Sequence, residues 1–346
     1  KLTVDMWVEN TNGSGQFNFE KYDTTFPGTK DKHTFKEELN NLNFAINGDM
    51  GNASESVYVE VSTGEQLKAI QNAGSKALGY NYALMGDINA SDVEDYVAIG
   101  TGNEIGFTGT FDGRGNRIIG LNVSGDDAGI FSTVGTNTVN NNDGTTTTYT
   151  GTVKDVNIYS GTFTGKTTAG AVAGENNGRI EGIVTFGNTV TSNGNAGGIV
   201  GVNNNDSTVD DVESTGSVIA GSSSAVAGGL VGTNDGGLSN SFSDSAVTVK
   251  VDNQNPVTTT GGLGGVVGVN TEKGNVQYVD SLGVTNGGAT GSSNIGGIIG
   301  TNNGNMYSGY NESIVSGKDN VGGLVGVNSG SVTNGRNNGT ITGTNN

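Results

Sequence analysis

Two pairs of adjacent carboxylates are the residues most suited to chemistry. Asp126-Asp127 and Asp210-Asp211 each place two acidic side chains next to one another in the chain. Carboxylate oxygens bind Ca²⁺, and facing carboxylates carry the acid–base chemistry of glycan-cleaving enzymes. Neither pair has the spacing of an EF-hand loop or of Ca²⁺-binding nonapeptide repeats. We expect all four to be solvated corner residues, with Ca²⁺ as the only cofactor that the sequence suggests.

Four aromatic residues could bind sugar rings by stacking. They follow successive copies of a repeated motif at similar offsets, which would bring them to one outer face: Phe242, Tyr278, Tyr307 and Tyr310. The alternative is an internal stack between neighbouring turns of the fold. The single histidine, His33, supports no Ser-His-Asp triad, and Asp112 lies in an Asp-Gly turn where its side chain would cap the backbone. We therefore expect no catalytic residues and no enzyme activity.

The repeated motif, Gly-Gly-aliphatic-aliphatic-Gly-x-Asn, must position these residues. Successive copies begin 26 to 42 residues apart, at Ala128, Gly170, Gly197, Gly228, Gly264, Gly296 and Gly322. A repeat of this length indicates a solenoid in which each copy belongs to one rung. Each rung would hold three short strands and three corners, and the variable steps fit loops inserted at corners. The sequence thus predicts an all-β parallel β-helix, or β-solenoid, over residues 63–346.

Alternation within the motif assigns its side chains to the inside or the outside. Glu175 precedes the asparagine of one copy, so that position should point outward and the asparagine inward. The asparagines would then form an internal ladder at one corner: Asn176, Asn203, Asn234, Asn270, Asn302 and Asn328. Asparagine suits this place because its side chain bonds both its own turn and the next asparagine.

The same alternation predicts an apolar lane on the outer face. It would consist of the second aliphatic residue of each copy: Ala173, Val200, Val231, Val267, Ile299 and Val325. Such a lane would be an interaction surface, for self-association among others, or would be covered by a loop. The alternative is that simple alternation fails at a narrow corner and that these side chains are buried.

The first part of the chain differs in character. Residues 1–62 should form an irregular cap, because the open end of a solenoid exposes strand edges, or else an earlier β-helical portion with a helical insert at 34–42. Thr63 is expected to N-cap a further short helix that buries Leu67 and Ile70. Strands should follow at 82–88 and on both sides of the Asp-Gly turn within 107–121. Insertions are expected around 140–148, as a hairpin or loop, and around 253–256.

Composition restricts the partners. The net charge of −18 argues against nucleic acid and against anionic membranes, both of which need basic surfaces. Without cysteine, the chain can form neither disulfides nor cysteine-based metal sites. No apolar run approaches the roughly 18 residues of a membrane helix. Because the chain begins with Lys1 and has no leader pattern, we interpret it as a mature or excised fragment.

Several segments resemble bacterial surface proteins. The copies of Gly-Gly-Leu-Val-Gly-x-Asn, such as Gly322 to Asn328, resemble the GLUG motif. Tyr82 to Ala90, Phe107 to Leu121 and Ala128 to Phe131 follow the order of a block in filamentous-haemagglutinin-like adhesins. The resemblance covers about residues 63 to 346. It implies a secreted, right-handed β-helical passenger or stalk that attaches cells to host or neighbouring surfaces, often through glycans. GLUG rungs also occur as non-catalytic parts of secreted proteases and glycan-acting enzymes.

Three functions follow from these observations. The first is a non-catalytic module of a larger secreted or cell-surface bacterial protein, an adhesin or stalk that binds a host or bacterial glycan or protein. The second is a polysaccharide-active lyase or hydrolase built on the β-helix. The third is a self-associating filament or surface-layer subunit. In all three the expected partners exclude nucleic acid, and no insertion into a membrane is expected.

Overall fold

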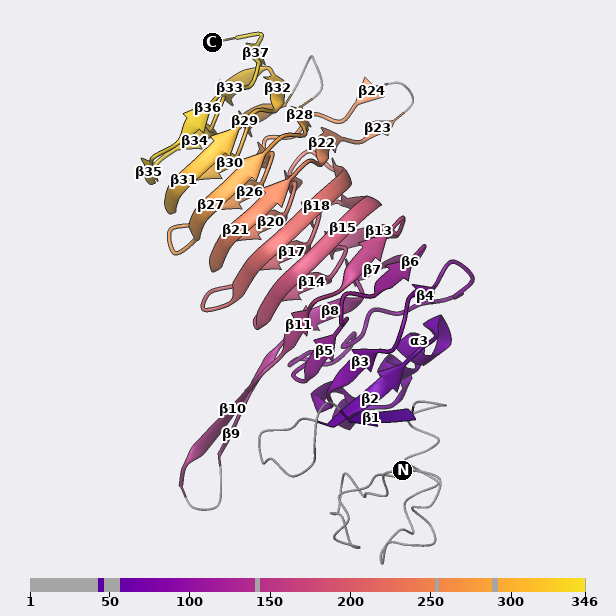
Figure 1. The fold of residues 1–346 in the computed structure, drawn as a ribbon. Helices are drawn as coiled ribbons and strands as arrows, with labels where there is room; N and C mark the ends of the chain where they lie inside the picture. The colour runs from indigo at the N-terminus through magenta and orange to yellow at the C-terminus, as the bar shows by residue number, and fades with distance from the viewer. Residues whose placement is uncertain (1–42, 47–56, 141–143, 253–254, 288–291, 346) are drawn as a thin grey trace, which may run out of the picture.

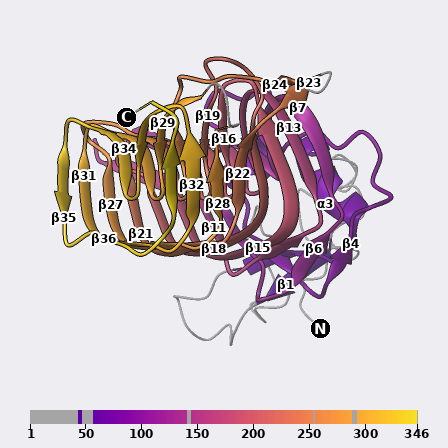
Figure 2. The same cartoon turned by 90° about the horizontal axis from the view of Figure 1, so that it is seen from above.

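The predicted β-solenoid is confirmed. The computed structural model describes residues 43–46, 57–140, 144–252, 255–287 and 292–345, which form a parallel β-solenoid of about nine turns. The rungs stack in sequence order from the N-terminal part, in indigo, to the last rung, in yellow (Figures 1 and 2). The helix predicted at 34–42 lies outside the described residues.

A short mixed segment precedes the regular rungs. It contains β1 (Asn43–Ile46), β2 (Val57–Val61), α3 (Gly64–Asn72), the 3₁₀ helix η3 (Ser75–Gly79), β3 (Tyr82–Leu84) and β4 (Ile88–Asn89). As predicted, Thr63 caps α3, because its Oγ1 accepts a hydrogen bond of 3.2 Å from the backbone N–H of Gln66. Leu67 and Ile70 are fully buried beneath the helix. β1 pairs antiparallel with β2, whereas β2 pairs parallel with β3 and so begins the solenoid ladder.

Each regular rung begins with two strand segments separated by a sharp bend. The strands that carry these segments are β5 (Thr110–Asp112), β6 (Arg117–Ile119), β11 (Thr152–Lys154), β12 (Asn157–Tyr159), β15 (Arg179–Ser192), β18 (Thr208–Ala220), β21 (Gly237–Ser243), β27 (Asn275–Ser281), β31 (Asn305–Asn311), β35 (Ser331–Thr333) and β36 (Arg336–Asn337).

The rung continues along a further side toward the motif corner. The strands here are β7 (Asn122–Ala128), β13 (Thr162–Gly170), β16 (Asn195–Gly197), β19 (Val226–Gly228), β22 (Ala246–Val249), β25 (Leu263–Gly264), β28 (Val284–Asn286), β29 (Ser293–Gly296), β32 (Ile314–Gly317), β33 (Asp319–Gly322) and β37 (Ile341–Gly343). Together with the preceding segments they belong to one continuous sheet that wraps the core.

The motif itself forms a separate seven-stranded parallel sheet among the described residues. Its strands are β8 (Phe131–Val134), β14 (Ala173–Asn176), β17 (Val200–Asn203), β20 (Val231–Asn234), β26 (Val267–Asn270), β30 (Ile299–Asn302) and β34 (Val325–Asn328). In the register of this sheet each asparagine lies opposite the next, as Asn203 lies opposite Asn234. From Asn176 onward, each Nδ2 donates to the Oδ1 of the following asparagine at 2.8–2.9 Å, as far as Asn328.

The apolar lane predicted for the outer face does not exist. Ala173, Val200, Val231, Val267 and Ile299 are all fully buried, and Val325 is half-buried in the last described rung. The reason is the sharpness of the Gly-Gly corner, where the strand before the corner folds against the strand after it. Thr233 Oγ1 of β20, for example, donates 2.7 Å to Asn195 Oδ1 of β16. Alternation along one extended strand therefore does not hold across this corner.

Two hairpins extend from the corners of the solenoid. β9 (Thr136–Asn140) and β10 (Thr146–Thr150) pair antiparallel and project away from the rungs (Figure 1), at the place where the sequence predicts an insertion. β23 (Val251–Asp252) and β24 (Asn255–Pro256) form a second, shorter antiparallel pair at the other predicted insertion. Both leave the stack of rungs intact, which is how solenoids accommodate added length.

Candidate binding surfaces

One bend in each rung has a left-handed backbone conformation. The residue at this bend follows the first strand segment and has a φ of 51–62°: Asp155, Gly182, Asp211, Asn240, Tyr278, Ser308 and Asn334. Gly, Asn and Asp are the residues that tolerate this conformation, whereas for a bulky residue it is less favourable by about 1–2 kcal/mol. Tyr278 is therefore the bulky exception in this column. The bend between β5 and β6, which is two residues longer, holds another bulky residue, Arg114, with a φ of 52°.

Two of the predicted aromatic residues form an exposed pair at this bend. Tyr278 and Tyr307 have rings 5.5 Å apart between centroids, in an edge-to-face arrangement. Tyr278 is 52% exposed and Tyr307 39% exposed. The internal stack considered from the sequence is thus not what the structure shows for these two side chains. Their rings form one apolar step, which we call the tyrosine platform, on the outside of β27 and β31.

The other two predicted aromatic residues lie near the platform but differ in their surroundings. Tyr310 is held by polar neighbours: its hydroxyl contacts Glu312, it accepts a hydrogen bond of 2.9 Å from Asn338 Nδ2, and the Arg336 guanidinium lies 5.6 Å from its ring centroid. Phe242 lines a shallow cavity of about 360 Å³ with Asp211 and Glu213. Phe242 and Tyr310 belong to the same column of the sheet, because Phe242 lies opposite Asp280 and Asp280 lies opposite Tyr310.

A second exposed aromatic pair was not predicted from the sequence. Phe186, 55% exposed, lies 5.6 Å from Tyr159, and the Arg117 guanidinium covers the Tyr159 ring at 5.5 Å. Tyr159 and Phe186 are opposite one another in the register of β12 and β15. Phe186 follows the first residue of its motif copy by 16 residues and Tyr159 by 31, so the offset of 11 to 14 residues in the predicted set does not find them.

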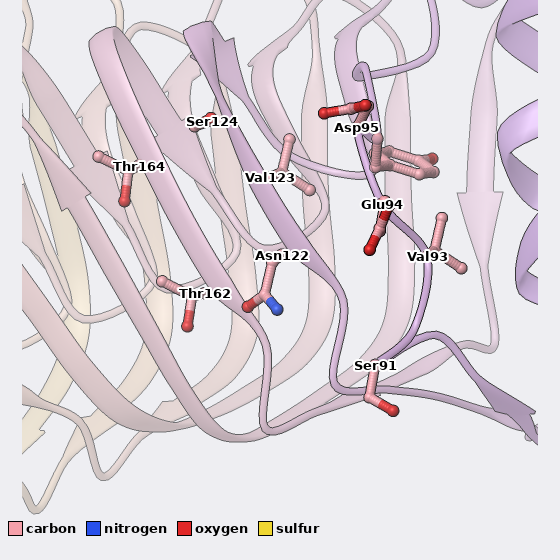
Figure 3. Close-up of a pocket in the computed structure, with 10 residues that line it drawn as sticks. Ser91, Val93, Glu94, Asp95, Asn122, Val123, Ser124, Thr162 and Thr164 are labelled. Carbon is pink, nitrogen blue, oxygen red and sulfur yellow. The ribbon is translucent and has the colours of Figure 1, made fainter.

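A large cavity lies under the long loop before β5. This cavity, which we call the loop groove, has a volume of about 570 Å³ and lies between loop residues 91–96 and the outer faces of β7 and β13. Figure 3 shows Asn122, Ser124, Thr162 and Thr164 along the floor and Glu94 and Asp95 on the loop. The loop is fixed from below, because the buried Tyr96 donates its hydroxyl hydrogen to the Ile130 carbonyl at 3.1 Å.

The loop groove is polar, acidic and open to a ligand. Hydroxyl and amide side chains form its floor, and no hydrogen bond joins those of Asn122, Ser124, Thr162 or Thr164 to another described residue. A second cavity of about 230 Å³ adjoins it at Ser124 and is lined by Asp126 and Asp127. Such a surface offers hydrogen bonds to a hydroxyl-rich ligand and repels anions.

The four predicted Ca²⁺ ligands fall into two separate places. Asp126 pairs with Lys166 at 2.9 Å on the surface, and Asp127 accepts a hydrogen bond of 2.8 Å from Thr168 Oγ1. Asp210 accepts from Ser239 Oγ and Asn240 Nδ2, whereas Asp211 occupies a left-handed bend. No group of three or more His, Cys, Asp or Glu side chains that could hold a metal ion occurs among the described residues. Ca²⁺ binding stays a prediction.

Asp127 has a carboxylate neighbour that the sequence did not reveal. Glu175, on β14, has a pKa above its ordinary value of 4.5, first because of burial and second because of the negative charge of Asp127. The two residues lie 48 positions apart in the chain, and they meet because Thr168, next to β14, lies opposite Asp127 in the register of β13 and β7.

We expect the Glu175→Gln variant to be more stable than the wild type at neutral pH. Because the pKa is raised in the folded state, the free energy of unfolding is highest below pH 4.5, where the Glu175 carboxyl is neutral in both the folded and the unfolded protein. The free energy of unfolding then falls as the pH rises from 4.5 through the folded pKa and the buried carboxyl ionises. The variant should therefore melt about 1–2 °C higher at pH 7 and no higher at pH 4. Thermal melts at both pH values test this, with the exposed Glu213→Gln as control. A gain of equal size at both pH values would refute it.

Comparisons with known proteins bear on the fold and on the enzyme question. No family model matches the chain, and no curated protein matches its sequence. A crystal structure from Bacteroides ovatus, provisionally named an immunoglobulin A1 protease, is similar with a TM-score of 0.59 and 18% identity, over 85% of this chain and 84% of that one. A second structure, named IgA1 protease, has a TM-score of 0.53 and 14% identity over 84% of this chain and 22% of that one.

These names contradict the expectation of a chain without enzyme activity. Both similar structures carry the name of a protease, so the proteins that share this fold point toward an enzyme. At 18% and 14% identity the likeness itself establishes the fold. This chain spans about a fifth of the length of the second protein. Among the helices described, none is long and apolar enough to cross a membrane. The chain is a β-solenoid that shares its architecture with proteins named as immunoglobulin A1 proteases.

Proposed function

We propose that this chain is the β-helical, substrate-binding part of a secreted, protease-type bacterial surface protein, and that the loop groove holds a carbohydrate of a glycoprotein substrate. The observation that carries the proposal is the loop groove, whose unpartnered hydroxyl, amide and carboxylate groups match the hydroxyl groups of a sugar. The GLUG-like repeats and the two fold relatives support the secreted, surface-bound setting.

The electrostatics narrow the class of carbohydrate. Glu94 and Asp95 form one wall of the loop groove, and none of the described residues that line it is cationic. The chain as a whole carries −18. Anionic sugars would be repelled by this wall, whereas neutral sugars and amino sugars would not. A neutral or amino-sugar residue of a protein-linked glycan is therefore the ligand that we assign to the groove.

We expect Thr162→Val together with Thr164→Val to weaken glycan binding about tenfold or more. Each replacement keeps the shape and strand preference of threonine but removes one hydroxyl from the groove floor, at about 0.5–1.5 kcal/mol per lost hydrogen bond. Binding is measured on a glycan array, with and without Ca²⁺, and on immobilised immunoglobulin A1 before and after deglycosylation. Fragments of the immunoglobulin on a gel would additionally place peptide-bond cleavage in this chain.

The next rung provides a matched control. Thr189 and Thr191 of β15 lie directly opposite Thr162 and Thr164 in the register, but they do not line the groove. The double variant Thr189→Val with Thr191→Val should bind like the wild type. Equal binding by both double variants, or no retention of any glycan by the wild type, would contradict the proposed function.

A further inference from the structure

The tyrosine platform is built at a position where the fold itself does not favour tyrosine. Six other rungs place Gly, Asn, Asp or Ser at the same left-handed bend, and Tyr278 has a φ of 52°. Strained backbone at a bulky residue persists only where something else maintains it, and such residues concentrate at functional sites. Folding alone gives no reason to keep tyrosine here, because its ring is 52% exposed and fills no part of the core.

The surroundings of the platform supply polar groups at its edges. Tyr307 lies opposite Gln277 in the register of β27 and β31, directly before the Tyr278 bend, and Ser308 occupies the equivalent bend in the next rung. The side chains of Gln277 and Ser308 make no hydrogen bond to any described residue. Two exposed rings flanked by a free amide and a free hydroxyl can accommodate a ring-shaped ligand with one apolar face and polar edges.

We propose that the tyrosine platform is a second carbohydrate-binding site, which stacks the apolar face of a neutral pyranose ring on Tyr278 and Tyr307. Gln277 and Ser308 would then bond the hydroxyl groups at the ring edge. This site is independent of the loop groove, because it belongs to β27 and β31, whereas the groove is formed by loop 91–96, β7 and β13. Two sites on one rigid solenoid would let the protein hold a branched or multiply glycosylated partner at two points.

The Tyr278→Asn variant separates binding from folding, because the two should change in opposite directions. Asparagine is a residue that the bend accepts in two other rungs, so the variant should melt at the same temperature as the wild type or about 2 °C higher. Its binding to immobilised neutral hexose oligosaccharides is measured in the Thr162→Val, Thr164→Val background, so that the loop groove does not contribute. There it should fall at least tenfold, as should that of Tyr307→Ser in the same background. These measurements use the full chain and an array of glucose-, galactose- and mannose-based oligosaccharides.

Two controls complete the experiment. Tyr149 on the β10 hairpin is 53% exposed, so Tyr149→Asn removes an equally exposed ring elsewhere and should leave binding unchanged. The Thr162→Val, Thr164→Val variant should keep its platform binding, which distinguishes a failure of the loop groove from a failure of the platform. Tetramethylammonium serves as a competitor, because exposed aromatic rings also bind cations.

Three results would overturn the proposal. One is a Tyr278→Asn substitution that leaves binding to the oligosaccharides unchanged in the Thr162→Val, Thr164→Val background. Another is a marked loss of stability in that variant, which would mean that the tyrosine serves the fold. The third is displacement of the wild type from the array by millimolar tetramethylammonium, which would identify the platform as a cation site.

Discussion

Replacing Asn234 by alanine is expected to destabilise the solenoid by about 3–5 kcal/mol. Asn234 is fully buried, accepts a hydrogen bond of 2.8 Å from Asn203 Nδ2, and donates to the Gly236 carbonyl at 3.1 Å and to Asn270 Oδ1 at 2.9 Å. Alanine would interrupt the ladder and leave buried donors and acceptors on both neighbouring rungs without this partner. Each such group costs about 1–3 kcal/mol when it cannot reach water.

The ladder contains its own control. Asn328 receives a hydrogen bond of 2.8 Å from Asn302 and is exposed to solvent in the last described rung. Water can replace the amide there, so Asn328→Ala should cost less than about 1 kcal/mol. Urea unfolding followed by circular dichroism compares the two midpoints. If both alanine variants unfold at the same urea concentration, the ladder does not contribute in the way that its hydrogen bonds suggest.

The architecture could be predicted because solenoids repeat. The Gly-Gly-aliphatic-aliphatic-Gly-x-Asn motif recurs once per rung, and its asparagine column and the insertions near 140–148 and 253–256 can be found by aligning the chain with itself. The helix after Thr63 was also predictable, since its cap and its two buried residues are local signals. The outward lane was wrong because alternation describes a straight strand, and Val200 follows a corner at which the chain reverses.

The candidate sites were harder to predict. The four aromatic residues follow their motif copies at similar offsets, which pointed to the tyrosine platform. The left-handed conformation of Tyr278, however, depends on the bend in the rung and has no signature in the residue itself. The loop groove was invisible in the sequence because it joins Glu94 and Asp95 to Thr164, some 70 residues further on, through an irregular loop. The protease names came from the similarity of the fold, because no family model and no curated protein matches the sequence.

Alanine at Gly229 is expected to destabilise the solenoid by about 3 kcal/mol. A Cβ atom there would lie 2.1 Å from the Gly265 carbonyl oxygen of the next rung and 2.1 Å from Ser243 Oγ across the core. A Cβ atom added at Gly198 or Gly265 would likewise lie 2.1–2.2 Å from a glycine carbonyl oxygen of the next rung and from a serine Oγ. At these three positions the core therefore has room only for a glycine facing a serine. The rungs would have to separate, which would weaken the hydrogen bond of 3.2 Å from the Gly229 N–H to the Gly264 carbonyl.

The test compares two glycines in neighbouring parts of the same rung. At Gly237 the nearest atoms to an added Cβ lie 3.8 and 3.9 Å away, so Gly237→Ala should fold and unfold like the wild type. The soluble fraction on expression and the urea midpoint are measured for both variants, and Gly229→Ala should be insoluble or unfold at a much lower urea concentration. Equal behaviour of the two would mean that the core is wider than these contacts indicate. The φ of Gly229 is not in the left-handed range, so its backbone conformation does not require glycine. Unequal behaviour of the two variants would therefore show that the second glycine of the motif is required because the core has no room for a Cβ atom there.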